Sequence, residues 1–296
     1  MRRLKVSAKS AGKRADVVVA GSFPRFSRSA LKALFKGGFV KIGQKLARPG
    51  HKLHAGETLV VDDSLLNSYP KSVKLPVIYQ DDDVVVINKP AGVLTHSKGA
   101  LNQEATVASF LNSFLTDKEL TGNRAGIVHR LDRDTSGLII CARNSAALAW
   151  LQKQFSARKV KKVYQAIVEG VPKEHRAVID APIERNPKRP QSFRVVAGGK
   201  AAQTVYDMVN TIKKGAKSYS LLKIRPVTGR THQIRVHMAY IGHPVVGDKV
   251  YGSGDGEMLL HASELELTLP SGQRKSFKTP LPERLSRYIQ GDNDAR

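Results

Sequence analysis

Short apolar runs of strand length recur along residues 75–289 of the 296-residue chain. They fall at Val84–Ile87, Leu138–Ile140, Val163–Val168, Ser220–Ile224 and Leu265–Leu269. Between these runs, residues 105–115 and 144–155 have the apolar spacing of helices. Because the expected strands neither alternate regularly with helices nor form an all-β array, the pattern predicts an α+β fold.

The first 65 residues follow a different pattern, built around one short amphipathic helix. Ser27–Gly37 predicts this helix, which Ser27 would cap and Gly37 would end. The apolar stripe of the helix would consist of Leu31, Leu34 and Phe35. Short strands are expected around a turn in residues 39–45 and again at residues 56–61.

Polar stretches mark the expected boundaries between these parts. Residues 66–74 are mostly polar and include a proline, which predicts a linker. The polar residues 290–296 predict a disordered tail. The chain therefore divides into a small module at 1–65, the linker, a larger domain at 75–289 and the tail.

The charge balance points to the partner. The chain has 49 Lys and Arg against 25 Asp and Glu, a formal net charge of +24. Such an excess predicts an anionic partner, either nucleic acid or an anionic membrane surface. No apolar run approaches the length that spans a bilayer, so nucleic acid is favoured and no membrane association is expected.

Three cations of the predicted N-terminal helix repeat every fourth residue and therefore share one face: Arg28, Lys32 and Lys36. At this spacing they repel one another slightly, and a polyphosphate partner would offset the repulsion. Residues 1–65 as a whole hold 14 Lys and Arg against 4 Asp and Glu. We predict that this face binds RNA, with a merely solvated helix face as the alternative.

Two features bear on location. Residues 1–15 are basic and free of acids, which suits a flexible arm touching RNA, although an organellar transit peptide can begin in the same way. The single cysteine, Cys141, excludes a disulfide framework and fits a reducing compartment. Because Cys141 follows an apolar run, a buried thiol is favoured over a nucleophile. A cytoplasmic protein is expected.

Two polar segments stand directly beside apolar, strand-like runs: Val128–Ile140 (VHRLDRDTSGLII) and Thr228–Met238 (TGRTHQIRVHM). Folded together, they could bring one carboxylate against several fixed guanidiniums. Such a pairing aims an ionised acid, which suits nucleophilic or base chemistry on a polyanion. For the first segment alone, a salt-bridged surface turn is the alternative.

These segments resemble the two signature motifs of the RluA-type pseudouridine synthase family, HRLDRDTSG at 129–137 and GRTHQIRVHMAYIGHPVVGDKVYG at 229–252. KVYQAIVEG at 162–170 is similar to the family's tyrosine motif, and DDDVVVINKPAG at 81–92 to the strand that opens its catalytic domain. The N-terminal part resembles the RNA-binding module shared with ribosomal protein S-four, although Ala15 stands where that module usually has leucine. The resemblance implies a small α/β module ahead of a catalytic domain with a central mixed, largely antiparallel sheet.

The resemblance also implies an isomerase that converts uridine in RNA to pseudouridine, with Asp132 as the reacting carboxylate. Asp132 could add to the sugar, add to the uracil ring or remove a ribose proton, and the sequence leaves these roles open. Asp134 is expected to hold the loop. By its place in the HQIR segment, Arg235 is expected to pair with Asp132, while Arg230 could pair instead or hold a phosphate.

Three further residues are expected to meet the RNA. Tyr164 offers a flat ring for the target uracil and a hydroxyl that could assist loss of the proton on ring carbon five; a core aromatic is the alternative. Arg130 could hold open the gap that an extruded base leaves, or could contact a phosphate. His232 is expected to bind substrate.

Histidines invite a metal interpretation, because His232, His237, His243 and His261 lie in the C-terminal third and His129 in the first motif. The five-residue step from His232 to His237 does not suit a zinc site on a helix, and a strand would turn the two to opposite faces. Hydrogen-bonded structural histidines are favoured, and no metal is expected. The isomerisation needs no hydride or phosphate, and the chain has no glycine-rich nucleotide fingerprint, so no cofactor is expected.

The expected substrate is large-subunit (23S) ribosomal RNA, where most family members with the N-terminal module act, and the protein is expected to be a monomer. One alternative is a pseudouridine synthase for tRNA, and another is a catalytically idle RNA-binding or ribosome-assembly protein, which the basic charge supports equally. A metal-dependent nuclease or deaminase using the histidines and Asp132 is a third. The intact set of Asp132, Tyr164 and Arg235 favours the enzyme.

Overall fold

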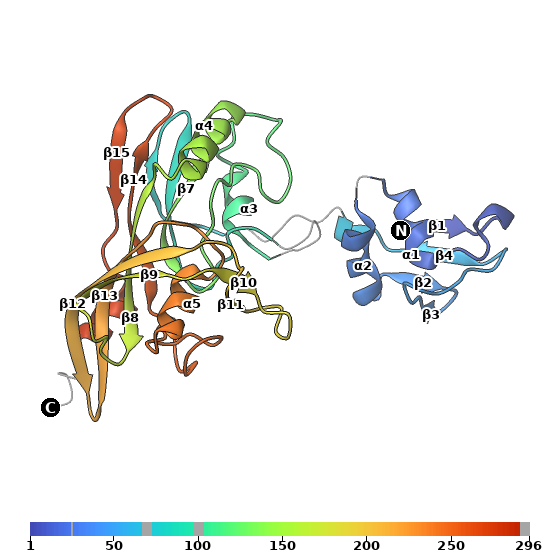
Figure 1. The fold of residues 1–296 in the computed structure, drawn as a ribbon. Helices are drawn as coiled ribbons and strands as arrows, with labels where there is room; N and C mark the ends of the chain where they lie inside the picture. The colour runs from blue at the N-terminus through green and yellow to red at the C-terminus, as the bar shows by residue number, and fades with distance from the viewer. Residues whose placement is uncertain (25, 67–72, 98–103, 291–296) are drawn as a thin grey trace. The chain divides into compact units, whose positions relative to one another are not determined.

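The computed structural model describes residues 1–24, 26–66, 73–97 and 104–290. The chain divides into two compact units, Met1–Val73 with His96–Ser109 and Lys74–Thr95 with Phe110–Arg296 (Figure 1). The predicted boundaries of a module at 1–65 and a larger domain at 75–289 stay a prediction. Parts of the predicted linker (67–72) and tail (291–296) lie outside the described residues.

The first unit contains a four-stranded antiparallel sheet in the order β1-β4-β2-β3. Its strands are β1 (Arg2–Lys5), β2 (Val40–Ile42), β3 (Lys45–Leu46) and β4 (Thr58–Val61). Its helices are α1 (Ala15–Ser22) and α2 (Arg28–Lys36), with 3-10 turns at Ala8–Ser10 and Ser64–Leu66. Sheet and helices share one apolar core.

The predicted N-terminal helix is confirmed as α2. Its N-cap, Ser27, accepts a hydrogen bond from the Ala30 N–H at 3.2 Å, and Gly37 follows its last residue. The predicted apolar stripe is buried in the core of the unit: Leu31, Leu34 and Phe35. The remaining face of α2 stays in solvent, which leaves its cations available to a partner.

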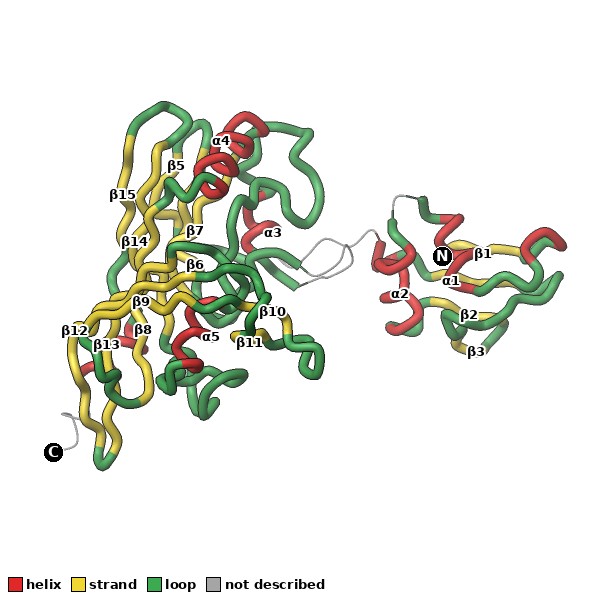
Figure 2. Tube along the Cα trace, viewed as in Figure 1, coloured by secondary structure: helices red, strands yellow, loops and turns green. Residues whose placement is uncertain are grey.

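Strands dominate the second unit (Figure 2). Its nine-stranded sheet follows the order β5-β6-β7-β14-β8-β13-β12-β9, with β15 paired to β14. The strands are β5 (Val77–Gln80), β6 (Val84–Lys89), β7 (Ser136–Ala142), β8 (Lys161–Glu169), β9 (Arg176–Asp180), β12 (Gln203–Lys214), β13 (Lys217–Pro226), β14 (Leu260–Thr268) and β15 (Arg274–Lys278). Among the described strands, β7 and β14 alone run parallel. The predicted α+β class, with a mixed and largely antiparallel sheet, is confirmed.

The second unit also contains α4 (Ser145–Ser156), α5 (Gln233–Tyr240), α6 (Glu283–Gln290) and the hairpin of β10 (Ile183–Arg185) and β11 (Phe193–Val195). The short helix α3 (Val107–Leu111) begins in the first unit and ends in the second. Ala147 and Leu151 of α4 pack on β6 and β7, whereas Ile234 and Met238 of α5 pack on β8 and β13. Two apolar clusters therefore fix the two helices over different parts of the sheet.

The strand-like interpretation of Thr228–Met238 is wrong, because most of this segment forms α5. Apolar Ile234, Val236 and Met238 alternate with polar residues as they would in a strand. In the structure all of Gln233–Met238 is buried, the polar side chains included. A helix buried on every side has no solvent face to reveal its period, so the sequence pattern was uninformative here.

No helix among the described residues is both long enough and apolar enough to cross a membrane.

Gly137 should be irreplaceable in the first motif. Its φ is +114°, and a Cβ there would lie 2.2 Å from the Ala262 carbonyl oxygen on β14. We expect Gly137→Ala to cost more than about 4 kcal/mol in the free energy of unfolding, or to prevent folding, because both backbones belong to a buried strand pair. Gly272→Ala, at a φ of +84° in open space, is the matched control and should cost about 1–2 kcal/mol. Equal shifts in the urea midpoints of the two variants would contradict the close approach.

Candidate active site

The loop that carries Asp132 leads directly into β7 and is tied down beside it. Thr95 Oγ1 accepts a hydrogen bond from the Leu131 N–H at 3.1 Å and donates one to the Leu131 carbonyl at 2.8 Å. The Thr135 N–H bonds back to the Asp132 carbonyl at 3.2 Å, which closes a turn around the acid. The backbone of Asp132 is therefore fixed on both sides.

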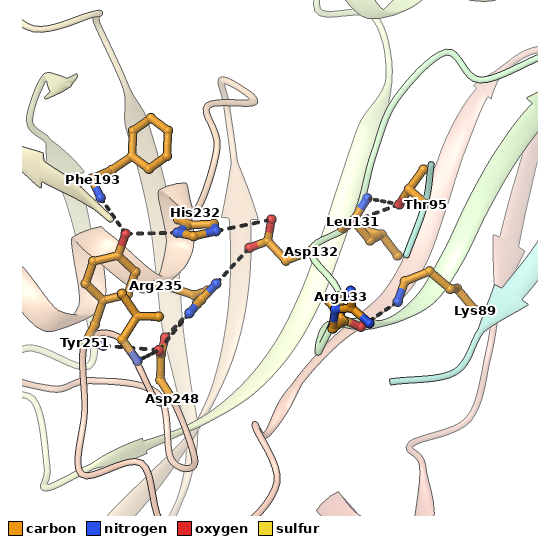
Figure 3. Close-up of polar contacts among 11 residues, drawn as sticks. Lys89, Thr95, Leu131, Asp132, Arg133, Phe193, His232, Arg235, Asp248 and Tyr251 are labelled. Carbon is orange, nitrogen blue, oxygen red and sulfur yellow. Dashed lines mark hydrogen bonds and ion pairs between the residues drawn. The ribbon is translucent and has the colours of Figure 1, made fainter. Parts of the chain in front are cut away.

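A buried lysine ties a second loop to this one (Figure 3). Lys89, at the end of β6, is fully buried and donates hydrogen bonds to the carbonyls of Pro90, Val93 and Arg133 at 3.0, 2.7 and 2.9 Å. Burial lowers the pKa of Lys89 to about 7, against the opposing effect of Asp132. The three acceptors belong to two loops, so this ammonium holds the loop of the acid against the loop that follows β6.

Arg235 joins two carboxylates at the centre of the site (Figure 3). Its Nε and Nη2 bond to the two oxygens of Asp248 at 2.6 and 2.8 Å, and its Nη1 lies 3.3 Å from Asp132 Oδ2. Asp248 is fully buried and also accepts hydrogen bonds from the Val250 and Tyr251 N–H groups at 2.9 and 3.2 Å. The expected ion pair of Asp132 and Arg235 is thus present, with a buried carboxylate behind it.

Burial and direct contact together determine the pKa values of Asp248 and Arg235. Burial acts to raise the pKa of Asp248, but the guanidinium of Arg235 outweighs it, and the net pKa is lowered. Burial acts to lower the pKa of Arg235, but the bond to Asp248 outweighs it, and the net pKa is raised. Both groups are therefore charged at neutral pH, and the fork of the guanidinium is fixed in one orientation.

His232 approaches the other oxygen of Asp132, with its Nε2 3.9 Å from Oδ1. Its Nδ1 lies 2.9 Å from the Tyr251 hydroxyl, which itself accepts a hydrogen bond from the Phe193 N–H at 2.7 Å. The tyrosine hydroxyl is thus free to donate to Nδ1, which places the proton of a neutral His232 on Nε2, toward Asp132. His232 has a left-handed φ of 57° at the N-cap of α5, a strained backbone that aims its ring.

A cleft of about 560 Å³ opens beside Asp132, of the size that small ligands occupy in proteins. Its walls include residues of both motifs and of β8: Arg130, Asp132, Lys162, Tyr164, Arg230 and His232. Burial, followed by the charge of Asp132, raises the pKa of Tyr164, so its hydroxyl keeps its proton. All catalytic and substrate-binding residues predicted for the larger domain thus line one cleft or, with Arg235, help form it.

The two other arginines are placed differently from Arg235. Arg230 Nε donates to the Ala201 carbonyl at 3.0 Å, so its guanidinium is turned away from an ion pair with Asp132. Arg130 is exposed at the cleft, and within the described part of the chain no hydrogen bond or ion pair holds it. Arg130 is therefore available to an anion or a base from outside.

The expected loop-holding role of Asp134 stays a prediction. Asp134 is exposed and its side chain has no hydrogen bond or ion pair among the described residues, although its negative charge favours the charged form of Lys89. The hydrogen bonds that hold the loop come from Lys89 and Thr95.

The sequence predicts no role for Lys89, Asp248 or Tyr251, although all three lie in segments that resemble family motifs, NKPAG and GDKVYG. The available signal for the first two was an ionisable residue close behind an apolar run, two residues after Ile87 for Lys89 and two after Val246 for Asp248.

The predicted hydrogen-bonding role of the remaining histidines is confirmed. His129 Nε2 accepts a hydrogen bond from the Ile140 N–H at 3.0 Å, and burial lowers the pKa of His129 to about 3. His237 bonds to a hydroxyl and a carbonyl oxygen at 2.9 Å each, His243 to a carbonyl oxygen at 2.8 Å and His261 to a hydroxyl at 2.7 Å. Within the described ranges, no three His, Cys, Asp or Glu side chains are grouped as metal ligands.

The predicted RNA-binding cations of the module lie in the first unit. Lys32 and Lys36 are exposed on α2 and line a groove of about 770 Å³ together with Arg48. Arg28 instead pairs with the buried Asp16 at 2.9 Å, and the guanidinium of Arg14 is the leading cause that lowers the pKa of Asp16. Because Asp16 is shared between Arg14 and Arg28, the charge of Arg28 is compensated in part within the unit, whereas those of Lys32 and Lys36 are not.

Comparison with known proteins adds a family. The family model described as RNA pseudouridylate synthase matches residues 83–240. A protein named ribosomal large subunit pseudouridine synthase D, from Xanthomonas campestris pv. campestris, is 38% identical over 98% of this chain and 92% of its own. The protein of the same name from Pseudomonas aeruginosa is 37% identical over 92% of this chain and 89% of its own. The solved structure of human RNA pseudouridylate synthase domain containing 1 covers 72% of this chain and 86% of its own, with a TM-score of 0.58 and 29% identity.

Lys89 should give the protein a characteristic pH dependence. Its pKa of about 7 lies below the ordinary value of 10.5, so between these values the unfolded chain binds a proton that the folded chain has lost. The free energy of unfolding of the wild type, relative to Lys89→Met, should therefore rise with pH above 7, by at most about 1.4 kcal/mol per pH unit. Denaturant unfolding at pH 6, 7, 8 and 9 measures this difference.

Lys153→Met, at an exposed site on α4, is the control and should show no such slope. A constant difference between wild type and Lys89→Met from pH 7 to 9 would mean that the three carbonyls keep Lys89 protonated.

Proposed function

We propose that this chain, which belongs to the RNA pseudouridylate synthase family, isomerises specific uridines of large-subunit ribosomal RNA with Asp132 as the reacting carboxylate. Enzymes of this family are isomerases that convert uridine in RNA to pseudouridine. The arrangement of Asp132, held by Arg235 at a cleft that also contains Tyr164, carries the proposal.

The reaction defines what the site must supply. The bond from ribose to uracil nitrogen one breaks, the ring turns, and a bond forms from ribose to ring carbon five. The proton of carbon five leaves and a proton is placed on nitrogen one, so the product has the same composition as the substrate. A single carboxylate at the reacting centre suits each of the three ways in which Asp132 could act: on the sugar, on the ring or on a ribose proton.

The two oxygens of the Asp132 carboxylate have different surroundings. Oδ2 faces Arg235 at 3.3 Å, whereas Oδ1 has His232 Nε2 at 3.9 Å, beyond hydrogen-bond distance. One oxygen is thus oriented while the other stays accessible for chemistry. Since the Arg235 fork is fixed by Asp248, the orientation costs no rearrangement when RNA arrives.

Other cleft residues have roles that fit their surroundings. Tyr164 stacks on the target uracil, and its hydroxyl assists the movement of the carbon-five proton as a neutral phenol. A base stacked within an RNA helix cannot reach the cleft, so the target base must be extruded. The free guanidinium of Arg130 then fills the gap that this base leaves. Arg230 and His232 line the same cleft and contact the bound nucleotide.

Large-subunit ribosomal RNA, 23S RNA in bacteria, is the favoured substrate because relatives that match nearly the whole chain carry that function in their names. The net charge of +24 supports a large polyanionic partner. Lys32 and Lys36 of α2 supply a second contact to this RNA. We place the enzyme in the cytoplasm as a monomer, and tRNA is the competing substrate.

Asp132→Asn should abolish isomerisation while RNA affinity stays within about twofold of wild type. The substitution keeps the size of the side chain but removes the reactive carboxylate, so turnover should fall by about 10⁴-fold or more. Tritium release from RNA labelled at carbon five of uridine measures turnover, with unmodified 23S RNA and a tRNA pool offered in parallel.

Asp134→Asn is the matched control, because Asp134 is exposed and two residues away. It should retain nearly wild-type release. Substantial release by Asp132→Asn would end the assignment of Asp132, and release from tRNA alone would end the assignment of the substrate. Tight binding without release from either RNA would favour a catalytically idle binding protein.

Replacing Lys32 and Lys36 together by glutamine should weaken the salt dependence of RNA binding. If each neutralises one phosphate, the slope of log K against log salt concentration should flatten by about 1.4–1.8. Filter binding at several salt concentrations measures this slope. The double Lys→Arg variant keeps both charges and should keep the slope; an unchanged slope in the glutamine variant would remove α2 from the interface.

A further inference from the structure

Lys162 lies in the cleft beside Tyr164 and has no part in the chemistry above. Both residues belong to β8 and are two positions apart, so their side chains project from the same face of the sheet. Their Cα atoms are about 6.6 Å apart at the usual rise of a strand. Both line the cleft that contains Asp132.

The ammonium of Lys162 lacks an adequate partner. Among the described residues, Lys162 Nζ makes one side-chain hydrogen bond, a long one of 3.5 Å to the Thr228 carbonyl oxygen. Within the part of the chain that the structure describes, no carboxylate lies within ion-pair distance of it. The side chain is partly buried, and this burial lowers the pKa of Lys162. A charge removed from water without a counterion is unfavourable, which makes its position here informative.

The walls of the cleft offer no compensation. Among its described lining residues Asp132 is the one carboxylate, and its Oδ2 already faces Arg235. The other cations of the lining, Arg130, Arg158 and Arg230, add positive charge, but they are exposed and hydrated. Gly229, beside Nζ, contributes no side chain and leaves the space in front of the ammonium open. The cleft is therefore short of an anion at Lys162.

We propose that Lys162 Nζ binds a phosphate group that flanks the target uridine, an inference that rests on the function proposed above. An ammonium is a compact point charge whose donors rotate to suit phosphate oxygens. A neutral uracil carbonyl oxygen would leave the buried charge uncompensated, whereas a phosphate neutralises it. Tyr164, two positions along β8, lies close enough for one nucleotide to meet both side chains.

The reaction gives this contact a purpose. Once the glycosidic bond breaks, the uracil must turn, so the contacts that hold the nucleotide cannot all be made to the base. A phosphate held by Lys162 keeps the ribose beside Asp132 while the ring moves. Lys162 is then a positioning residue for the sugar–phosphate, distinct from the groups that meet the ring.

A binding cycle tests this contact directly. Two versions of the 23S RNA fragment that responds in the tritium assay are compared: native, and with uncharged methylphosphonates at the two linkages flanking the target uridine. Each is bound to wild type and to Lys162→Met at fixed salt. We expect Lys162→Met alone, or the methylphosphonates alone, to weaken binding by about tenfold or more. The two changes together should weaken binding little more than either one does alone.

Single methylphosphonates then identify which of the two phosphates is held. Lys153→Met, which removes an exposed lysine, should lose affinity equally for both RNAs. If the fold-losses in affinity from Lys162→Met and from the methylphosphonates multiply when the two changes are combined, the proposal is overturned. Multiplied losses mean additive free energies, which independent contacts give. Unchanged affinity of Lys162→Met for native RNA would overturn it as well.

Stability separates a binding lysine from a structural one. Because Lys162 makes one weak bond in the free protein, Lys162→Met should leave the melting temperature unchanged or raise it. A marked loss of stability would identify Lys162 as structural instead. If the proposed function is wrong, wild type releases no tritium. If only the inference about Lys162 is wrong, wild type releases tritium, but the affinity losses from the two changes multiply in the binding cycle.

Discussion

The guanidinium of Arg235 holds the site together because it serves two carboxylates at once. Two of its nitrogens are committed to the fully buried Asp248, and that carboxylate is itself fixed by two backbone N–H groups. The remaining nitrogen can point in one direction, and Asp132 lies there at 3.3 Å. A buried ion pair adds little to stability compared with apolar residues of the same volume. Its value in this position is orientation, since a hydrophobic replacement would leave the Asp132 carboxylate, which we propose to be the reacting group, without a fixed direction.

The sheet gives that orientation a rigid frame. The loop of Asp132 ends in β7, whose parallel pairing with β14 depends on a glycine at the closest approach. From the neighbouring β6, Lys89 reaches the carbonyl of Arg133, one residue beyond the acid. On the opposite side, α5 supplies Arg235 from a helix buried on every side. Reactive groups supported by strand ends and a packed helix vary less in position than groups on free loops.

The sequence was informative where local pattern and environment agree. The apolar runs located β6, β7, β8, β13 and β14, and the cap and stripe of α2 located that helix. The pairing of Asp132 with Arg235 came from family resemblance, because no local rule joins residues so far apart in the chain. The segment of α5 was mistaken for a strand since complete burial erased its helical period. The roles of Lys89 and Asp248 were missed because a charge in a sequence looks the same whether solvent or protein surrounds it.

Because a sequence does not show what surrounds a charge, the structure is needed to identify which of the many cations are available to RNA. Arg235 is paired with Asp248, and Arg28 shares Asp16 with Arg14, so the charge of Arg235 is compensated and that of Arg28 is compensated in part before any partner arrives. Arg130, Lys162, Lys32 and Lys36 have no carboxylate partner among the described residues. A net charge of +24 opposes the compact state through self-repulsion between the cations. Binding of an anionic partner to the cations without an internal carboxylate offsets this repulsion. In the proposed complex the phosphates of RNA supply the missing anions, so the cations to examine for recognition are those without an internal carboxylate, wherever they lie along the chain.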